Sequence, residues 1–114
     1  MTLPLKTASL LRIFVEESQR WEHKPLYEAI VLKAKEMHLA GATVLRGIMG
    51  YGATKHLHTT KILDLSFDLP IIVEIIDTEE KIHAFLPHVQ SLASNGLITV
   101  EEVRFLTLHA NGSN

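Results

Sequence analysis

The chain has 114 residues, of which 46% are hydrophobic and 21% charged, and its formal net charge is -2. This length suits one domain with one hydrophobic core, and the composition excludes an intrinsically disordered chain. The weak negative charge argues against a nucleic-acid-binding protein, and the absence of cysteine excludes disulfides and thiolate chemistry.

No stretch approaches the roughly 18 apolar residues of a membrane span, and the first residues lack the apolar segment of a signal peptide. We therefore expect a cytoplasmic protein without direct membrane insertion and without a nucleic acid partner. We expect a single domain over residues 1–114, with a core at about 9–108, a flexible loop at about 50–66 and a frayed tail at 109–114.

The first half of the chain predicts two strands with a helix between them. Alternating apolar side chains predict a strand at Leu10–Glu16. Pro25 suits the first turn of a helix, and apolar residues then recur at intervals of three and four up to Met37. Gly41 is expected to end this helix, and the second strand is predicted at Thr43–Met49.

A second helix is predicted after residue 77. Asp77 or Thr78 can cap it, and Glu80 is placed to complete a capping box from Asp77. An apolar stripe at helical spacing then runs from Ile82 to Ala93, and Asn95-Gly96 is expected to end the helix. Because Pro87 lies inside this stripe and lacks a backbone N–H group, we expect a kink or a break into two short helices.

The remaining strands are predicted at Leu69–Asp77 and Leu97–Leu108. The order strand, helix, strand, strand, helix, strand is that of an α+β, ferredoxin-like βαββαβ sandwich, a four-stranded antiparallel sheet with two helices on one face. The strand at Leu69–Asp77 is apolar on both faces and interrupted only by Glu74. Two helices cover one face of such a sheet, so we expect a homo-oligomer in which a second copy covers the other.

A long segment, Gly50–Lys61, separates the second and third predicted strands, although a hairpin needs only about two to five linking residues. From Gly50 to Leu63 the chain contains no acidic residue but two lysines, two histidines, three threonines and two glycines. Such a segment can present backbone N–H groups, hydroxyls and cations to a phosphate or carboxylate. We predict a functional, anion-binding loop; a solvated loop without a ligand is the alternative.

Arg46 alternates with Val44 and Ile48, so it shares a face with apolar residues and is a candidate cation for a cleft. The alternative is an interface ion pair with a residue such as Glu74. Lys55 and His58, in the long segment, are further candidates for contacts to an anion.

Two histidines leave a second function open. His56 and His58 would lie on one face of an extended segment, and together they form a partial metal site. The alternative function is therefore a metal-binding or metal-tolerance trimer of ferredoxin-like fold. No Ser/His/Asp arrangement can be recognised from spacing, and Glu16 and Glu17 are expected to be solvated at the end of a strand. We therefore expect no enzymatic activity.

Three segments, Pro25–Ile30, Gly41–Gly52 and Asp68–Asp77, closely resemble a widespread uncharacterised family of PII-like proteins. The resemblance covers about residues 9–106. This family is similar to the nitrogen-regulatory PII signalling proteins, which are trimers of ferredoxin-like subunits. The resemblance implies a homotrimer that binds an adenine nucleotide (ADP, AMP or ATP) in clefts between subunits, with no covalently bound cofactor. It also implies a flexible T-loop that docks on a partner such as a membrane transporter, a channel or an enzyme.

Within this resemblance, Gly50-Tyr51-Gly52 looks like the Gly-Phe-Gly that opens the T-loop of PII, and Leu69-Pro70 looks like the T-loop exit. PII has a lysine directly after its Leu-Pro, where this chain has Ile71. The predicted ligand-binding residues are Arg46, Gly50, Tyr51, Gly52, Lys55 and His58. No catalytic residue and no resident metal are predicted.

Overall fold

The structure is a computed structural model that describes residues 3–51, 58–59 and 68–109. Its elements are, in chain order, β1 (Lys6–Glu16), β2 (Arg20–Trp21), β3 (Lys24–Pro25), α1 (Leu26–Glu36), β4 (Thr43–Arg46), β5 (Met49–Gly50), β6 (His58–Thr59), β7 (Pro70–Asp77), α2 (Glu79–Leu92) and β8 (Leu97–Phe105). The flexible loop expected at about 50–66 lies mostly outside the described residues, as does the tail from residue 110.

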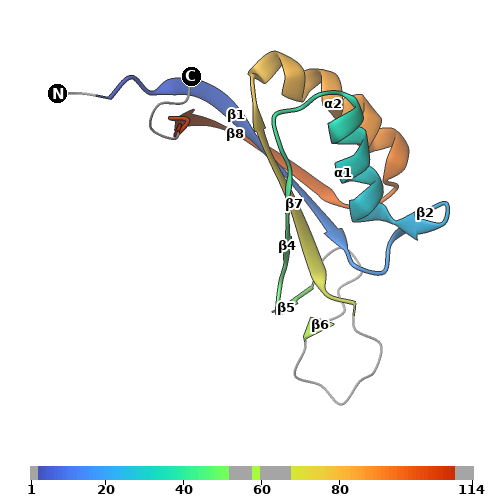
Figure 1. Ribbon diagram of the computed structural model, residues 1–114. Coiled ribbons are helices and arrows are strands. Elements are labelled where there is room, and N and C mark those ends of the chain that lie inside the picture. Colours follow the sequence, from blue (N-terminus) through green and yellow to red (C-terminus); the bar gives the residue numbers. More distant parts are fainter. Residues whose placement is uncertain (1–2, 52–57, 60–67, 110–114) are drawn as a thin grey trace.

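Four strands form one antiparallel sheet in the order β4-β7-β1-β8. Both helices lie over the same face of this sheet (Figure 1). The strands β2 and β3 form a separate hairpin, and β5 pairs with β6. The prediction of an α+β, ferredoxin-like fold is confirmed.

The hydrophobic core fills the space between the helices and the sheet. Alternate residues of β1 and β7 point into it, and each helix contributes an apolar stripe. The cluster consists of Leu11, Ile13, Val15, Leu26, Ile30, Ala34, Ile71, Val73, Ile75, Ile82, Phe85 and Val89. Since full burial of one large apolar side chain stabilises by roughly 1.5–3 kcal/mol, this cluster fixes how the helices sit on the sheet.

Thr78 caps α2, with its side-chain oxygen accepting a hydrogen bond from the backbone N–H of Lys81 at 3.2 Å. The carboxylate of Asp77 accepts instead from the backbone N–H groups of Thr78, at 2.7 Å, and Ala40, at 2.9 Å. Asp77 therefore ties the connection between α1 and β4 to the start of α2.

A kink or a break was predicted at Pro87, and of these the break is wrong, because α2 runs continuously over Glu79–Leu92. Ile82 and Phe85 before the proline and Val89 after it are all buried. Packing of this stripe against the sheet keeps both halves of the helix in one element despite the missing N–H group.

Some strand boundaries differ from their predictions. β1 begins at Lys6, before the expected start, because the far end of β8 continues to pair with it there. The predicted strand Thr43–Met49 is divided into β4 and β5 by Gly47 and Ile48. The β2–β3 hairpin was not predicted, since strands of two residues are too short to show a period of two.

The opposite face of the sheet, which neither helix covers, carries an apolar row. Directly paired residues of an antiparallel sheet point to the same side, so Leu45, Ile72, Phe14 and Leu97 line up across β4, β7, β1 and β8. We call the surface formed by Leu10, Arg12, Phe14, Leu45, Ile72, Glu74, Ile76, Leu97 and Glu101 the open face. The prediction that the strand at 69–77 is apolar on both faces, with helices over only one, is confirmed.

A charged cluster interrupts the apolar open face. The Nε of Arg12 donates to Glu74 at 2.8 Å, and its Nη1 donates to Glu101. The two carboxylates raise the pKa of Arg12, chiefly through the hydrogen bond with Glu74. One guanidinium and two carboxylates leave this cluster with one net negative charge.

In residues 3–51 and 68–109, neither helix combines the length and the apolar character that crossing a bilayer requires.

Candidate functional site at the loop end of the sheet

One end of the sheet gathers the residues that the sequence pointed to. β1 and β4 end there, and β7 and β8 begin there, because the four strands are antiparallel. The long segment leaves the sheet after Arg46 and rejoins it at Pro70. We call residues 46–51 and 68–70 the loop base; in Figure 1 it lies at the end of the sheet marked by β5 and β6.

At the start of the loop base, Gly47 is in close contact with Pro70. Its N–H group donates to the carbonyl oxygen of Pro70 at 2.7 Å. A Cβ at position 47 would lie 2.7 Å from Cγ of Pro70, and one at Gly50 would lie 3.2 Å from the same atom. The backbone therefore passes this close to Pro70 only because both positions are glycine.

At the end of the loop base, Asp68 is held by Ser18, which follows β1. The carboxylate of Asp68 accepts from the Ser18 N–H group at 2.8 Å and from the Ser18 Oγ at 2.6 Å. Next to it, the N–H group of Glu17 donates to the carbonyl oxygen of Leu69 at 2.9 Å. Three hydrogen bonds thus fasten the returning chain to the end of β1.

Arg46 is paired with Glu17 through its Nη2 atom. Within the subunit, Glu74 lies opposite Thr43 on the open face and pairs with Arg12. An ion pair between Arg46 and such a residue across an interface stays a prediction. The side chain of Arg46 remains 58% exposed. Part of its guanidinium surface is therefore accessible for contact with an anion.

The turn between α2 and β8 lies at the same end of the sheet. The Nε2 of Gln19 donates to the carbonyl oxygen of Asn95 at 3.1 Å. Gly96 has a φ of +146°, and a Cβ there would lie 2.8 Å from the carbonyl oxygen of Phe14. Glycine is therefore needed at position 96 both for its backbone conformation and for its contact with β1.

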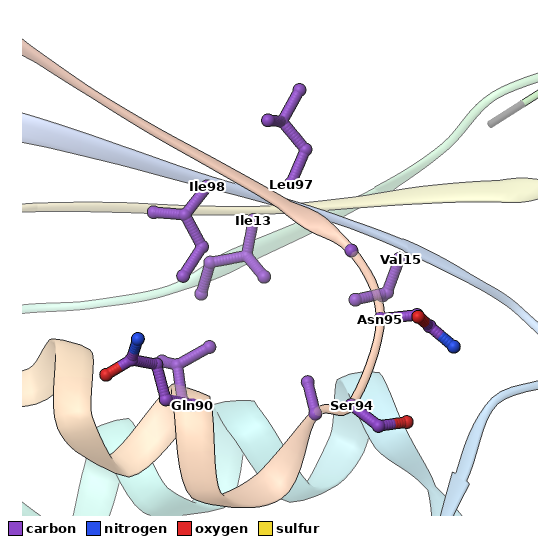
Figure 2. Close-up of a pocket in the computed structure, with 10 residues that line it drawn as sticks. Ile13, Val15, Gln90, Ser94, Asn95, Leu97 and Ile98 are labelled. Atoms are coloured by element: carbon purple, nitrogen blue, oxygen red, sulfur yellow. The ribbon is translucent and has the colours of Figure 1, made fainter. Parts of the chain in front are cut away.

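A cavity of about 240 Å³ opens beside this turn, on the helix side of the sheet. Ile13, Val15 and Ile98 line it from the sheet, whereas Gln90 and Ser94 contribute polar atoms near its rim (Figure 2). The cavity has room for a small group.

The structure places three of the predicted ligand-binding residues on the outgoing chain of the loop base. Arg46, Gly50 and Tyr51 all belong to the start of the loop base, and Tyr51 is exposed. His58 lies on β6, where its backbone pairs with Gly50. The other two, Gly52 and Lys55, lie outside the described residues.

The proposed metal ligand His56 also lies outside the described residues. Within residues 3–51 and 68–109, no three His, Cys, Asp or Glu side chains gather closely enough to hold a metal ion. The described part of the chain therefore offers no support for the metal-binding alternative.

Sequence reasoning did not identify Ser18, Gln19 or Asp68 as parts of this end of the sheet. Ser18 and Gln19 lie in a short turn with no motif, and their partners are 50 and 76 residues away along the chain. A pairing at such separations leaves no local pattern, so only the fold reveals it.

The protein resembles solved structures of PII-like proteins. The similarity to CPII from Thiomonas intermedia K12, solved with ADP and bicarbonate, has a TM-score of 0.69 at 17% identity and covers 91% of this chain and 93% of that chain. A putative PII-like signaling protein from Thermus thermophilus gives 0.65 at 20% identity, covering 91% and 94% of the two chains. These similarities show a PII-like fold.

Similar sequences lead to the same family. A UPF0166 protein of Aquifex aeolicus is 48% identical over 99 residues, which is 87% of this chain and 93% of that protein. A UPF0166 protein of Methanocaldococcus jannaschii is 35% identical over 96 residues, covering 83% and 88%. Residues 8–105 match the family model DUF190, "Uncharacterized ACR, COG1993". The chain therefore belongs to this uncharacterised, PII-like family.

Proposed function

We propose that the protein is a PII-like regulator. Its subunits assemble into a trimer, bind an adenine nucleotide or another small anion between subunits next to the loop base, and act on a partner through the long loop. The partner we favour is a membrane transporter or channel. In this proposal the protein works in the cytoplasm and catalyses no reaction.

The open face supports assembly. It carries an apolar row across the sheet, and Leu45 and Leu97 in this row are 44% and 59% exposed in the single subunit. Burying such a row against further copies contributes roughly 25 cal/mol for each square ångström of apolar surface removed from water. The trimeric stoichiometry rests on the resemblance to PII proteins, since the row itself is equally compatible with a dimer.

The proposal that a ligand binds here is supported chiefly by the structure of the loop base. Gly47 and Gly50 bring the backbone close to Pro70, and Arg46 keeps part of its guanidinium exposed beside them. A planar guanidinium can bind phosphate or carboxylate through two parallel hydrogen bonds. CPII, which shares the fold, was solved with ADP, AMP, bicarbonate and acetate. Contacts from Gly52, Lys55 and His58 remain predictions.

Isothermal titration tests this function, with ADP, AMP, ATP, cyclic AMP, bicarbonate and Zn²⁺ as ligands. We expect at least one nucleotide to bind below millimolar concentration. Arg46→Met should weaken that binding about ten- to a hundredfold, the range for one lost charge-assisted hydrogen bond. Arg20→Met is the matched control, because Arg20 lies on the separate β2–β3 hairpin and donates to the carbonyl oxygen of His23 within it.

Two results would contradict the proposal. One is the absence of binding by every nucleotide and small anion up to millimolar concentration, which would leave the loop as a protein-docking element. The other is tight Zn²⁺ binding that is lost in a His56→Ala, His58→Ala double variant and unaffected by Arg46→Met, which would favour the metal-binding alternative.

A further inference from the structure

The turn that follows β1 contacts three parts of the chain that are far apart in sequence. Glu17 pairs with Arg46, Ser18 holds the carboxylate of Asp68, and Gln19 donates to the carbonyl oxygen of Asn95. We call residues 17–19 the junction turn. It joins the outgoing chain of the loop base, the returning chain of the loop base and the turn between α2 and β8.

Gln19 is partly buried and is held by hydrogen bonds from both its side chain and its backbone. Its Oε1 accepts from the backbone N–H group of Glu16 at 2.8 Å, which leaves the amide nitrogen to donate to Asn95. Its own N–H group donates to the carbonyl oxygen of Glu16 at 3.1 Å, and its carbonyl oxygen accepts from Leu26 at 2.8 Å. Both backbone groups and both ends of the side-chain amide are therefore in use.

We expect the turn between α2 and β8 to move when a molecule binds beside it. Ser94, Asn95 and Gly96 form one wall of the cavity of about 240 Å³ (Figure 2). The side chains of Ser94 and Asn95 are at the surface, so few apolar contacts hold this turn in place. The Gln19 hydrogen bond is a direct polar link from it to the junction turn.

We propose that Gln19 is a positioning residue that couples the turn between α2 and β8 to the loop base. A shift of Asn95 alters its hydrogen bond with Gln19. Because Glu17 and Ser18 belong to the same turn, their contacts with Arg46 and Asp68 are altered as well. In a regulatory version of this proposal, a nucleotide bound beside the turn between α2 and β8 alters the loop base. That version rests on the proposed function.

The coupling can be measured without any ligand by a double-variant cycle on amide hydrogen exchange. Ser94→Gly loosens the turn between α2 and β8, and the reporter is the N–H group of Ser18, which donates to Asp68. Gln19→Glu keeps the acceptor for Glu16 and removes the donor to Asn95. The N–H group of Lys81, bonded to Thr78 at the far end of α2, is the internal control.

We expect Ser94→Gly to speed exchange at Ser18 by about two- to tenfold in the parent, the range for one neutral hydrogen bond, and to leave Lys81 unchanged. In the Gln19→Glu background this increase should disappear. Gln19→Met, which introduces no charge, should behave in the same way and keeps the test valid if Gln19→Glu does not fold. The proposal would be overturned if Ser94→Gly sped exchange at Ser18 equally with and without Gln19. It would also be overturned if Ser94→Gly had no effect on Ser18 in the parent.

A parallel measurement with ADP separates the two proposals. If ADP binds, it should change exchange at Ser18 in the parent, and Gln19→Glu should bind ADP while showing a smaller change. If ADP does not bind, the proposed function fails for that nucleotide, and the ligand-free cycle still decides whether Gln19 couples the two places.

Discussion

Arg12 on β1 lies directly opposite Glu74 on β7, and its Nε donates to that carboxylate at 2.8 Å. Glu101 on β8 takes a second hydrogen bond from the same guanidinium. Arg12 is therefore the sole positive charge of a three-residue cluster on the face of the sheet that the proposed assembly buries. Removing it would leave two carboxylates, on the strands that flank β1, without the cation that they share.

We expect Arg12→Met to weaken the oligomer, because burying two unpaired carboxylates costs more than burying a paired cluster. Sedimentation velocity over a range of protein concentrations measures the change. A triple variant in which Arg12, Glu74 and Glu101 are all replaced by Met should assemble at least as well as the parent. Unchanged assembly of Arg12→Met would mean that the open face is not an interface.

Leu45→Asp tests the apolar row on the open face. We expect this variant to sediment as a folded monomer, since an aspartate buried in an apolar interface is not compensated. Leu32→Asp is a matched control, because Leu32 lies on α1 and is 46% exposed, compared with 44% for Leu45. Equal dissociation of both variants would show that the leucines act through folding and not through assembly.

Gly47→Ala should perturb the loop base. The added Cβ would come within 2.7 Å of the Pro70 ring, and we expect a loss of stability of about 1–3 kcal/mol in urea unfolding. Gly41→Ala has no atom within 4 Å of its Cβ and should be neutral or stabilising by about 0.4–1 kcal/mol. Similar stabilities for the two variants would contradict the close contact with Pro70.

The pKa of Glu36 should depend on Lys33. The Nζ of Lys33 donates to Glu36 at 2.9 Å, and this hydrogen bond lowers the pKa of Glu36 below its ordinary value of 4.5. The stabilising contribution is therefore present above pH 4.5 and is lost as the pH falls through the lowered pKa. Carbon NMR titration should show the pKa of Glu36 rising toward 4.5 in Lys33→Met. It should stay in place in Lys35→Met, and a rise in both variants would argue against the specific pair.

The sheet and its core could be predicted from the sequence because their patterns are local. Ile71, Val73 and Ile75 alternate along one strand, and the apolar stripe of α2 recurs at helical spacing. Ile72, between two of those buried residues, and Ile76, directly after the third, also indicated an uncovered face. These features depend on the period of each element, and the period is visible in a single segment.

The contacts around the loop base could not be predicted, because they join segments that the fold alone brings together. Arg46 was predicted as a cleft cation from its place in the alternation, and nothing in the sequence pointed to Glu17, with which it pairs. The bond from Gln19 to Asn95 likewise depends on where β1 ends relative to α2. Residue type suggested the chemistry of Arg46, and only the strand register determined its partner.

Pro70 has a consequence for the long segment that precedes it. Gly47 donates to the carbonyl oxygen of Pro70, but proline has no N–H group to return the bond, so the ladder between β4 and β7 must stop there. The point at which the chain departs is thus set by Pro70 and is independent of the residues beyond Gly47. Since closing a longer loop costs only slightly more entropy, we expect the fold to tolerate longer, shorter or different segments at this point. The segment's length and specificity can evolve, or be engineered, while the sheet keeps its register.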